Sequence, residues 1–281
     1  MPIDPYQADL EKAAELISQA DSIVIAAGAG IGVDSGLPDF RGDRGFWKAY
    51  PALQRSGIGF MDIATPSAFK ATPERAWGFY GHRLALYRST VPHAGFGILK
   101  SWADRLPSGG FVFTSNVDGA FQKADFAGDR IAEHHGTIHR LQCLDLCSND
   151  TWSADSLRPD IDAATCHWLG ELPRCPRCGG LARPNILMFG DGDWLGARSN
   201  MQGALLQRWL GTVRRPVVVE VGAGTAIPSV RMFSDSVVLN YSGRLVRINP
   251  RESNVGTSLD VGLAYGSLHA LREIDALVDL N

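Results

Sequence analysis

The stretch that decides the fold is SIVIAAGAGIGVDSGLPDFRG, residues 22–42. Residues 22–27 form a short, β-branched apolar run, which is typical of a strand buried on both faces of a parallel sheet. Five glycines crowd into the next fifteen positions. A glycine-rich turn after such a strand lets backbone N–H groups approach a phosphate-bearing nucleotide. Val33 stands where the G-x-G-x-x-G fingerprint has its last glycine, so the turn alone also fits a strand end without a ligand.

Short apolar runs alternate with helix-like segments along much of the chain. Strands are predicted at 110–114, 130–134, 217–221, 237–240 and 245–249, and helices over 94–105, over 201–212 and from Asp4-Pro5 onward. Strands that alternate with helices predict an α/β fold, a parallel sheet with helices on both faces.

Two segments interrupt this rhythm, and we expect them to form a smaller domain beside the sheet. Residues 43–94 are rich in Trp, Tyr and Pro and look helical or irregular, and residues 138–183 hold every cysteine and show little strand signal. The predicted division is a sheet domain of 1–42, 95–137 and 184–281, with a helical insertion of 43–94 and a cysteine module of 138–183.

Composition narrows the functional classes. Of the 281 residues, 45% are hydrophobic and 20% charged, as in soluble globular proteins with a sizeable core. The net charge of −3 does not favour nucleic acid as a partner. No apolar run approaches the roughly 20 residues that cross a bilayer, and the N-terminus lacks a secretory pattern. We therefore expect a cytoplasmic protein without a membrane partner.

Two cysteine pairs predict a metal site. CLDLC supplies Cys143 and Cys147, and CPRC supplies Cys175 and Cys178 after 27 intervening residues. In a reducing compartment such pairs favour metal ligation over disulfides, and four thiolates make the closed tetrahedral shell of a structural zinc. The alternative is unligated buried thiols, and Cys166 is either a free thiol or a substitute ligand.

Residues 28–42 resemble the G-A-G-I-S-x-x-S-G-I-P-D-F-R-G signature of the sirtuins, the Sir2 family of NAD-dependent protein deacylases, with Gly32 for Ser and Leu37 for Ile. TSNVDG (114–119), EHHGTIH (133–139) and RPNILMFGD (183–191) are similar to T-Q-N-I-D-G, E-x-H-G and R-P-x-V-V-F-F-G-E. VGAGTAIPS (221–229) and INP (248–250) are the most divergent blocks. The resemblance spans residues 23–249 and implies a Rossmann-like NAD-binding domain with a zinc module.

The resemblance implies NAD as co-substrate, one structural zinc, and a loop of Asp39-Phe40-Arg41 over the nicotinamide ribose. Carried over position by position, the NAD contacts are Gly28, Ala29, Gly30, Asp39, Phe40, Arg41, Ser115, Asn116, Asp118, Gly222, Gly224 and Asn249.

It also implies three catalytic residues. His135, followed by glycine, takes the role of general base, for which an imidazole pKa of about 6.5 is suited. Asn116 and Asp118 orient the nicotinamide ribose and the nicotinamide amide.

Substrate contacts follow in the same way. The segment Ile186, Leu187, Met188 and Phe189 would pair with the substrate peptide and line the acyl-lysine tunnel, although it also reads as a buried strand. Tyr80 and Arg83 lie three residues apart on a predicted helix and share a face. They are similar to the Tyr-x-x-Arg of sirtuins that remove succinyl or malonyl groups, where Arg binds a carboxylate through two N–H groups. A surface Arg beside a half-buried Tyr is the alternative.

The expected function is NAD-dependent deacylation of protein lysines, acetylated or possessing an acidic acyl group, which yields nicotinamide, O-acyl-ADP-ribose and free lysine. ADP-ribosyl transfer or NAD hydrolysis is the nearest alternative, because Gly32, Ser115 and Ala223-Gly224 depart from the family pattern around the cofactor. A non-catalytic NAD sensor and a nucleic-acid-binding zinc protein are more distant alternatives. The sequence carries no prediction for the oligomeric state or for segment 150–172.

Overall fold

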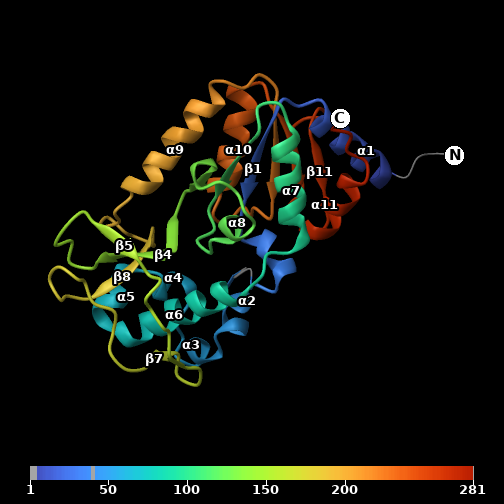
Figure 1. The fold of residues 1–281 in the computed structure, drawn as a ribbon. Helices are drawn as coiled ribbons and strands as arrows, with labels where there is room; N and C mark the ends of the chain where they lie inside the picture. The colour runs from blue at the N-terminus through green and yellow to red at the C-terminus, as the bar shows by residue number, and fades with distance from the viewer. Residues whose placement is uncertain (1–4, 39–41, 281) are drawn as a thin grey trace.

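The computed structural model describes residues 5–38 and 42–280 and contains one large parallel sheet (Figure 1). Its six strands run in the order β11-β10-β9-β1-β2-β3, and each neighbouring pair is parallel. The strands are β1 (Ser22–Ala27), β2 (Gly110–Thr114), β3 (Ile131–Glu133), β9 (Pro216–Val221), β10 (Arg244–Ile248) and β11 (Val261–Leu263).

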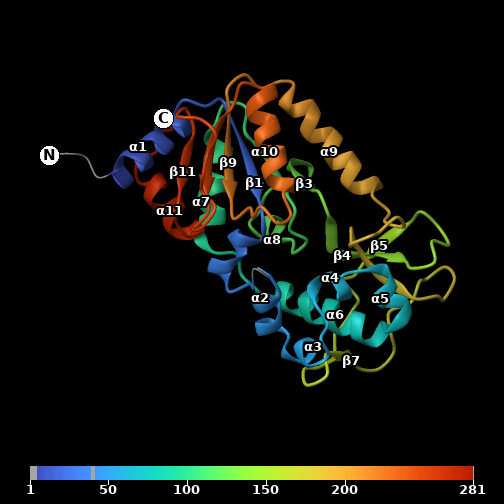
Figure 2. The ribbon, with the colours of Figure 1, turned by 180° about the vertical axis from the view of Figure 1, so that it is seen from behind.

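Helices cover both faces of this sheet, as predicted. One face packs against α1 (Pro5–Ser18), α7 (Ala94–Arg105) and α11 (Ser267–Asp275). The other packs against α9 (Ala197–Leu210) and α10 (Ser229–Asn240), which are seen in the reverse view of Figure 2. Strand β1 explains the arrangement, because Ile23 and Ile25 belong to the first core and Val24 to the second. Every residue of β1 is buried, so its consecutive apolar residues reflect a strand that is covered on both faces of the sheet.

The strand order places a topological switch point beside β1. From β1 the chain moves outward through β2 and β3, and then returns to the other side of β1 through β9, β10 and β11. Ala27 lies level with Thr114 of β2 and Val221 of β9, so the three strands end at one edge. Open α/β sheets bind ligands at such an edge, outside the carboxyl ends of the strands.

A smaller part lies beside that edge (Figure 1). Its helices are α2 (Gly42–Ala49), α3 (Pro51–Arg55), α4 (Phe60–Ile63), α5 (Pro66–Ala71) and α6 (Pro73–Ser89). They share an aromatic-rich core with an antiparallel sheet of order β5-β4-β8, made of β5 (Thr151–Ser153), β4 (Gly136–Cys143) and β8 (Ala182–Ile186). Short elements complete the chain: 3₁₀ segments η1 (Ala29–Ser35) and η2 (Gly128–Arg130), α8 (Ala120–Lys123), β6 (Ile161–Asp162) and β7 (His167–Trp168).

Two sequence-based expectations were wrong. The predicted strand at 237–240 is the last turn of α10, whose buried residues Val230, Ser234 and Val237 recur at helical spacing. Three consecutive apolar residues do not distinguish a strand from a helix end. The cysteine module contains more strand than expected, because β4 and β8 are held by pairing with each other and not by a strong local pattern. The predicted domain boundaries stay a prediction.

None of the helices within the described ranges combines the length and the apolar character that crossing a membrane requires.

Candidate active site and metal site

The glycine-rich turn after β1 packs backbone against backbone on the turn after β9. The N–H groups of Gly28 and Gly30 donate to the carbonyls of Val221 and Gly222, each over 3.0 Å. A Cβ on Gly222, whose φ is 66°, would lie 2.3 Å from the amide nitrogen of Ile31, and a Cβ on Gly28 would lie 2.7 Å from the Gly222 carbonyl oxygen. Both glycines are therefore required by the contact between the two turns, a reason that the sequence did not reveal.

The TSNVDG segment brings two polar side chains to the same edge. The Asn116 side-chain amide donates to the Gly28 carbonyl over 3.1 Å, and the Ser115 amide donates to the Ala27 carbonyl over 3.1 Å. Asp118 accepts the Ala120 N–H over 2.9 Å, which fixes the start of α8. Burial raises the pKa of Asp118, while this hydrogen bond and the charge of Arg83 oppose the shift. The loop thus ties β2 to the turn after β1.

His135 lies between β3 and β4, next to this loop. Its ring nitrogen Nε2 is 3.5 Å from the hydroxyl of Ser229 at the start of α10, and its carbonyl accepts the Leu187 N–H over 2.9 Å. Burial lowers the pKa of His135 to about 4, repulsion from His134 adds to the shift, and a hydrogen bond with the Ser115 backbone opposes it. The imidazole is neutral near pH 7 and is able to accept a proton.

His134 precedes His135 in the chain, and the centroids of the two rings are 4.9 Å apart. Its ring packs on Phe113 with centroids 5.1 Å apart, and its N–H donates to the Thr114 carbonyl over 2.8 Å.

Asn249 is part of the wall of the edge. It is fully buried, its amide donates to the Ala223 carbonyl over 2.8 Å, and its carbonyl oxygen accepts the N–H groups of Arg251 and Glu252. Gly224 sits next to it, and a Cβ there would meet only the Glu252 carboxylate, at 3.5 Å. In this structure the side chain of Asn249 joins two turns, because it donates to the turn after β9 and accepts two N–H groups of the turn after β10.

The segment after β8 is held by a buried ion pair. Ile186 pairs with Gly136, and Met188 is buried, whereas 37% of Leu187 is exposed. Asp191 accepts two hydrogen bonds from Arg183, at 2.6 and 2.9 Å, and one from the Met188 N–H at 3.2 Å. β8 ends at Ile186, and the ion pair closes the turn at 189–190 that follows, while the Leu187 N–H stays bonded to His135.

Phe189 joins this segment to the helices of the smaller part. Its N–H donates to the Ala64 carbonyl over 3.0 Å, and its ring meets Phe60 edge to face with centroids 5.6 Å apart. Phe60 in turn contacts Phe79 of α6 at 6.3 Å. An aromatic row therefore leads from Phe189 to α6.

Tyr80 and Arg83 lie at the end of that row and are both buried. Tyr80 stacks on Phe69 with centroids 5.5 Å apart, and the Arg83 guanidinium carbon lies 5.3 Å from the centre of the Phe79 ring. Burial raises the pKa of Tyr80, and the charges of Arg83 and Arg183 oppose that shift, so the phenol stands near both cations. The expected alternative of a surface Arg is wrong, because only 8% of Arg83 is exposed.

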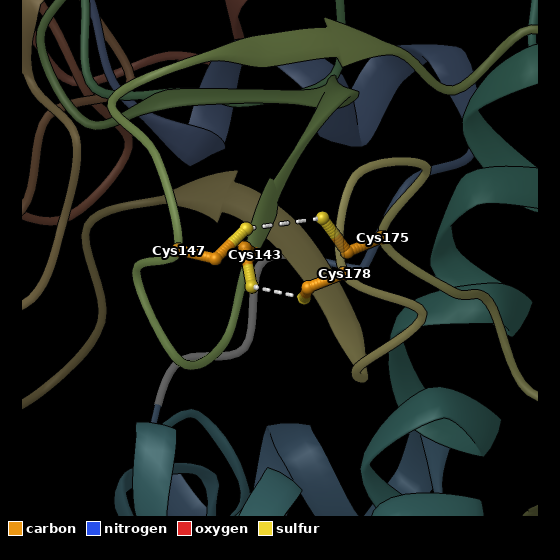
Figure 3. A group of neighbouring side chains, drawn as sticks. All are labelled: Cys143, Cys147, Cys175 and Cys178. Atoms are coloured by element: carbon orange, nitrogen blue, oxygen red, sulfur yellow. Dashed lines mark hydrogen bonds between the residues drawn. The ribbon is translucent and has the colours of Figure 1, made fainter.

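The four paired cysteines converge on one point between the end of β4 and the loop before β8 (Figure 3). The sulfur of Cys143 is 3.7 Å from that of Cys178, that of Cys147 is 3.5 Å from that of Cys175, and all four lie within 4.8 Å of one another. Tetrahedral Zn–S bonds of about 2.3 Å put sulfurs about 3.8 Å apart, so the set fits zinc.

Cys166 is not a member of that cluster. It is buried, its backbone carbonyl packs on Gly78 of α6, and burial raises the pKa of its thiol to about 11. It is a structural thiol, and the substitute-ligand alternative is wrong.

The structure brings most sequence-predicted site residues to one edge of the sheet, and Asp39, Phe40 and Arg41 lie outside the described residues. Sequence reasoning missed Ser229, which becomes a neighbour of His135 only through the fold. It also missed Tyr87, whose hydroxyl accepts a hydrogen bond from Arg83 Nε over 2.9 Å. The spacing of four residues between the two on one helix was a usable signal.

The structure combines a sheet edge suited to nucleotide binding, at the switch point of an open α/β sheet, with a module in which four thiols cluster. Together these two features define the class of protein. The model of the Sir2 family matches residues 28–203. The chain belongs to the Sir2 family, as its sequence motifs predicted.

Characterised relatives span most of the chain. The "NAD-dependent protein deacylase" of Pyrococcus furiosus is 32% identical over 263 residues, 88% of this chain and 88% of that protein. That of Aquifex aeolicus is 28% identical over 254 residues, 90% of this chain and 93% of that protein. Among solved structures, a Sir2 homologue–NAD complex aligns with a TM-score of 0.70 and 23% identity over 95% of this chain and 92% of that one, which supports the fold.

Proposed function

We propose that this chain is an NAD-dependent protein lysine deacylase. The observation that carries the proposal is the meeting of Asn116, Asp118 and a neutral His135 beside the Gly28–Gly222 contact. The deacylase names of the relatives that span the chain support the same activity. The partner is an acyl-lysine protein.

NAD supplies the ADP-ribose that accepts the acyl group, with nicotinamide as leaving group. In this proposal Asn116, whose side chain is anchored on the Gly28 carbonyl, orients the nicotinamide ribose, and Asp118 holds the nicotinamide amide. His135 accepts a proton from a ribose hydroxyl. Its imidazole is unprotonated at neutral pH, and with a pKa of about 4 it is a weaker base than the value of about 6.5 expected from the sequence. One water molecule completes the release, and the products are nicotinamide, O-acyl-ADP-ribose and lysine.

The four-cysteine cluster holds one structural zinc. Four thiolates leave no open position on the metal, so zinc contributes stability and not a reaction step. The Cys147–Cys175 and Cys143–Cys178 sulfur pairs, 3.5 and 3.7 Å apart, act as metal ligands only while they stay reduced. A cytoplasmic, reducing location is therefore part of the proposal.

The acyl group that this site prefers is acidic, such as succinyl or malonyl. Arg83 is a buried cation on the aromatic row that starts at Phe189, and the charges of Arg83, Arg183 and Asp191 all act on the buried Tyr80 phenol. Arg can bind a terminal carboxylate through two N–H groups, and the Tyr hydroxyl supplies a third donor.

Mass spectrometry of products tests the activity. Purified protein, NAD and matched acetyl- and succinyl-lysine peptides should yield free lysine peptide and an equal amount of O-acyl-ADP-ribose. Free ADP-ribose alone would indicate NAD hydrolysis, and a modified protein would indicate ADP-ribosyl transfer; either result without deacylation would contradict the proposal.

Two adjacent histidines give a matched control. His135→Ala should abolish deacylation with NAD binding retained, whereas His134→Phe, which keeps an aromatic ring against Phe113 and His135, should keep most turnover. Equal losses in the two variants would remove His135 from its role.

The acyl preference is tested by Arg83→Met. This variant should lose turnover of the succinyl-lysine peptide and keep turnover of the acetyl-lysine peptide. A matching loss on both peptides would refute the acidic-acyl preference and leave the deacylase activity standing.

A further inference from the structure

Arg83 is held by a second tyrosine on its own helix. The Tyr87 hydroxyl accepts hydrogen bonds from Nε, at 2.9 Å, and from Nη2 of Arg83. The guanidinium carbon lies 5.2 Å from the centre of the Tyr87 ring, and 7% of Tyr87 is exposed. The two residues are four apart on α6, so they share one face.

We propose that Tyr87 is a positioning residue for acyl-group selection: its hydroxyl fixes the direction of the Arg83 guanidinium and thereby sets the affinity for acyl groups that end in a carboxylate. This inference rests on the proposed acidic-acyl preference. It adds a residue that the Tyr80–Arg83 pattern does not contain.

Physical reasoning supports the role of the hydroxyl. An arginine side chain has several rotatable bonds, and recognition of a carboxylate by two parallel N–H bonds demands a defined guanidinium plane. Two hydrogen bonds to one oxygen, together with the flanking rings of Phe79 and Tyr87, define that plane before any substrate arrives. Because the guanidinium is already ordered, the substrate does not lose binding free energy in ordering it.

The helix end that bears Tyr87 is itself anchored. The Lys123 ammonium donates to the carbonyls of Tyr87, Arg88 and Thr90 at 2.7, 2.8 and 2.9 Å, where α6 ends. Tyr87 also lines a cavity of about 10 Å³ with Gly32, Leu37 and Asp118. Its phenol therefore borders the Asp118 side of the site and contacts Arg83 on the acyl side.

The test is the ratio of kcat/KM for succinyl-lysine to that for acetyl-lysine peptides of one sequence, measured on the zinc-loaded full chain at saturating NAD. Tyr87→Phe keeps the ring and removes the hydroxyl. Since hydrogen bonds to charged groups contribute more than neutral ones, the ratio should fall about tenfold or more, through a higher KM for the succinyl peptide. The acetyl parameters should change less than about twofold.

Tyr6→Phe is the matched control. Tyr6 packs against the core of the large sheet, and its hydroxyl lies 3.1 Å from the His269 ring nitrogen Nε2. This variant should leave the ratio unchanged. An equal fall in both variants, or an unchanged ratio in Tyr87→Phe, would overturn the inference.

The ratio is taken within one preparation, so a smaller folded fraction of Tyr87→Phe cancels. A second pair guards against misfolding: Tyr87→Gln retains an oxygen acceptor and Tyr87→Met does not. A higher ratio in the Gln variant supports the inference, and equal ratios overturn it. If the unmodified protein does not prefer succinyl-lysine, the acidic-acyl proposal itself fails; if it does, and only Arg83→Met loses the preference, the Tyr87 inference alone fails.

Discussion

Replacing Asp191 by Asn should destabilise the protein by disrupting its most deeply buried ion pair. The side chains of Arg183 and Asp191 are both fully buried, and the carboxylate receives two N–H bonds from the guanidinium and one from Met188. Asp191→Asn keeps the shape of the side chain but leaves the Arg183 charge without its counter-charge.

The size of the effect follows from that burial. Removing one partner of a buried pair costs about 3–5 kcal/mol. With a shift of about 2–4 °C per kcal/mol for large domains, the Tm should fall by about 6 °C or more. The double variant Arg183→Met/Asp191→Leu should recover most of the loss, because no uncompensated charge stays buried.

Thermal unfolding of the zinc-loaded chain measures this effect, with Asp104→Asn as control. Asp104 pairs with Lys100 on the surface of α7, where 58% of the Asp104 side chain is exposed, so its loss should cost less than about 1 kcal/mol. A Tm loss in Asp191→Asn no greater than that in Asp104→Asn would refute the reasoning. Where the variant folds, the KM for the peptide should rise, because the Met188 backbone loses an anchor.

Three further results are expected. Because burial lowers the pKa of His135 to about 4, kcat/KM should not decline around pH 6.5 but only as pH falls toward about 4 and the imidazole gains its proton; an acid limb near 6.5 assigned to His135 would contradict this. Elemental analysis should find one zinc per chain, lost with a lower Tm in Cys178→Ser and retained in Cys166→Ser; zinc loss in the latter would overturn the four-ligand assignment. Denaturant titration should show that Gly222→Ala lowers the free energy of unfolding by about 1–3 kcal/mol, because the φ of Gly222 is 66° and a Cβ there would meet the backbone. Gly203 lies inside α9 with open space around the position of a Cβ, so Gly203→Ala should raise the free energy of unfolding by about 0.5–1 kcal/mol.

Local patterns predicted the elements whose burial is unambiguous. The β-branched run at 22–27, followed by a glycine-rich turn, predicted a strand covered on both sides, and β1 is buried at every position. The prediction of a strand at 237–240 was wrong, because three apolar residues in a row show no periodicity and the preceding turns of α10 decide their conformation. The pairing of β4 with β8 was equally invisible, because it joins segments about 40 residues apart.

The sequence by itself determined the chemical groups: the glycines, the Asn-x-Asp and His-Gly pairs, four cysteines in two pairs and a Tyr-x-x-Arg. These are readable because each rests on residue type at short spacing. Only the tertiary structure decided their surroundings, since burial and contact are properties of the packed chain. It showed that Gly28 and Gly222 are needed for the close backbone contact between their two turns, and that the Asn249 side chain hydrogen-bonds within the turns after β9 and β10. It also showed that Cys166 is not part of the cysteine cluster and that the Tyr87 hydroxyl hydrogen-bonds Arg83. The pKa of His135 also belongs to the fold, because desolvation depends on what long-range packing places over the ring.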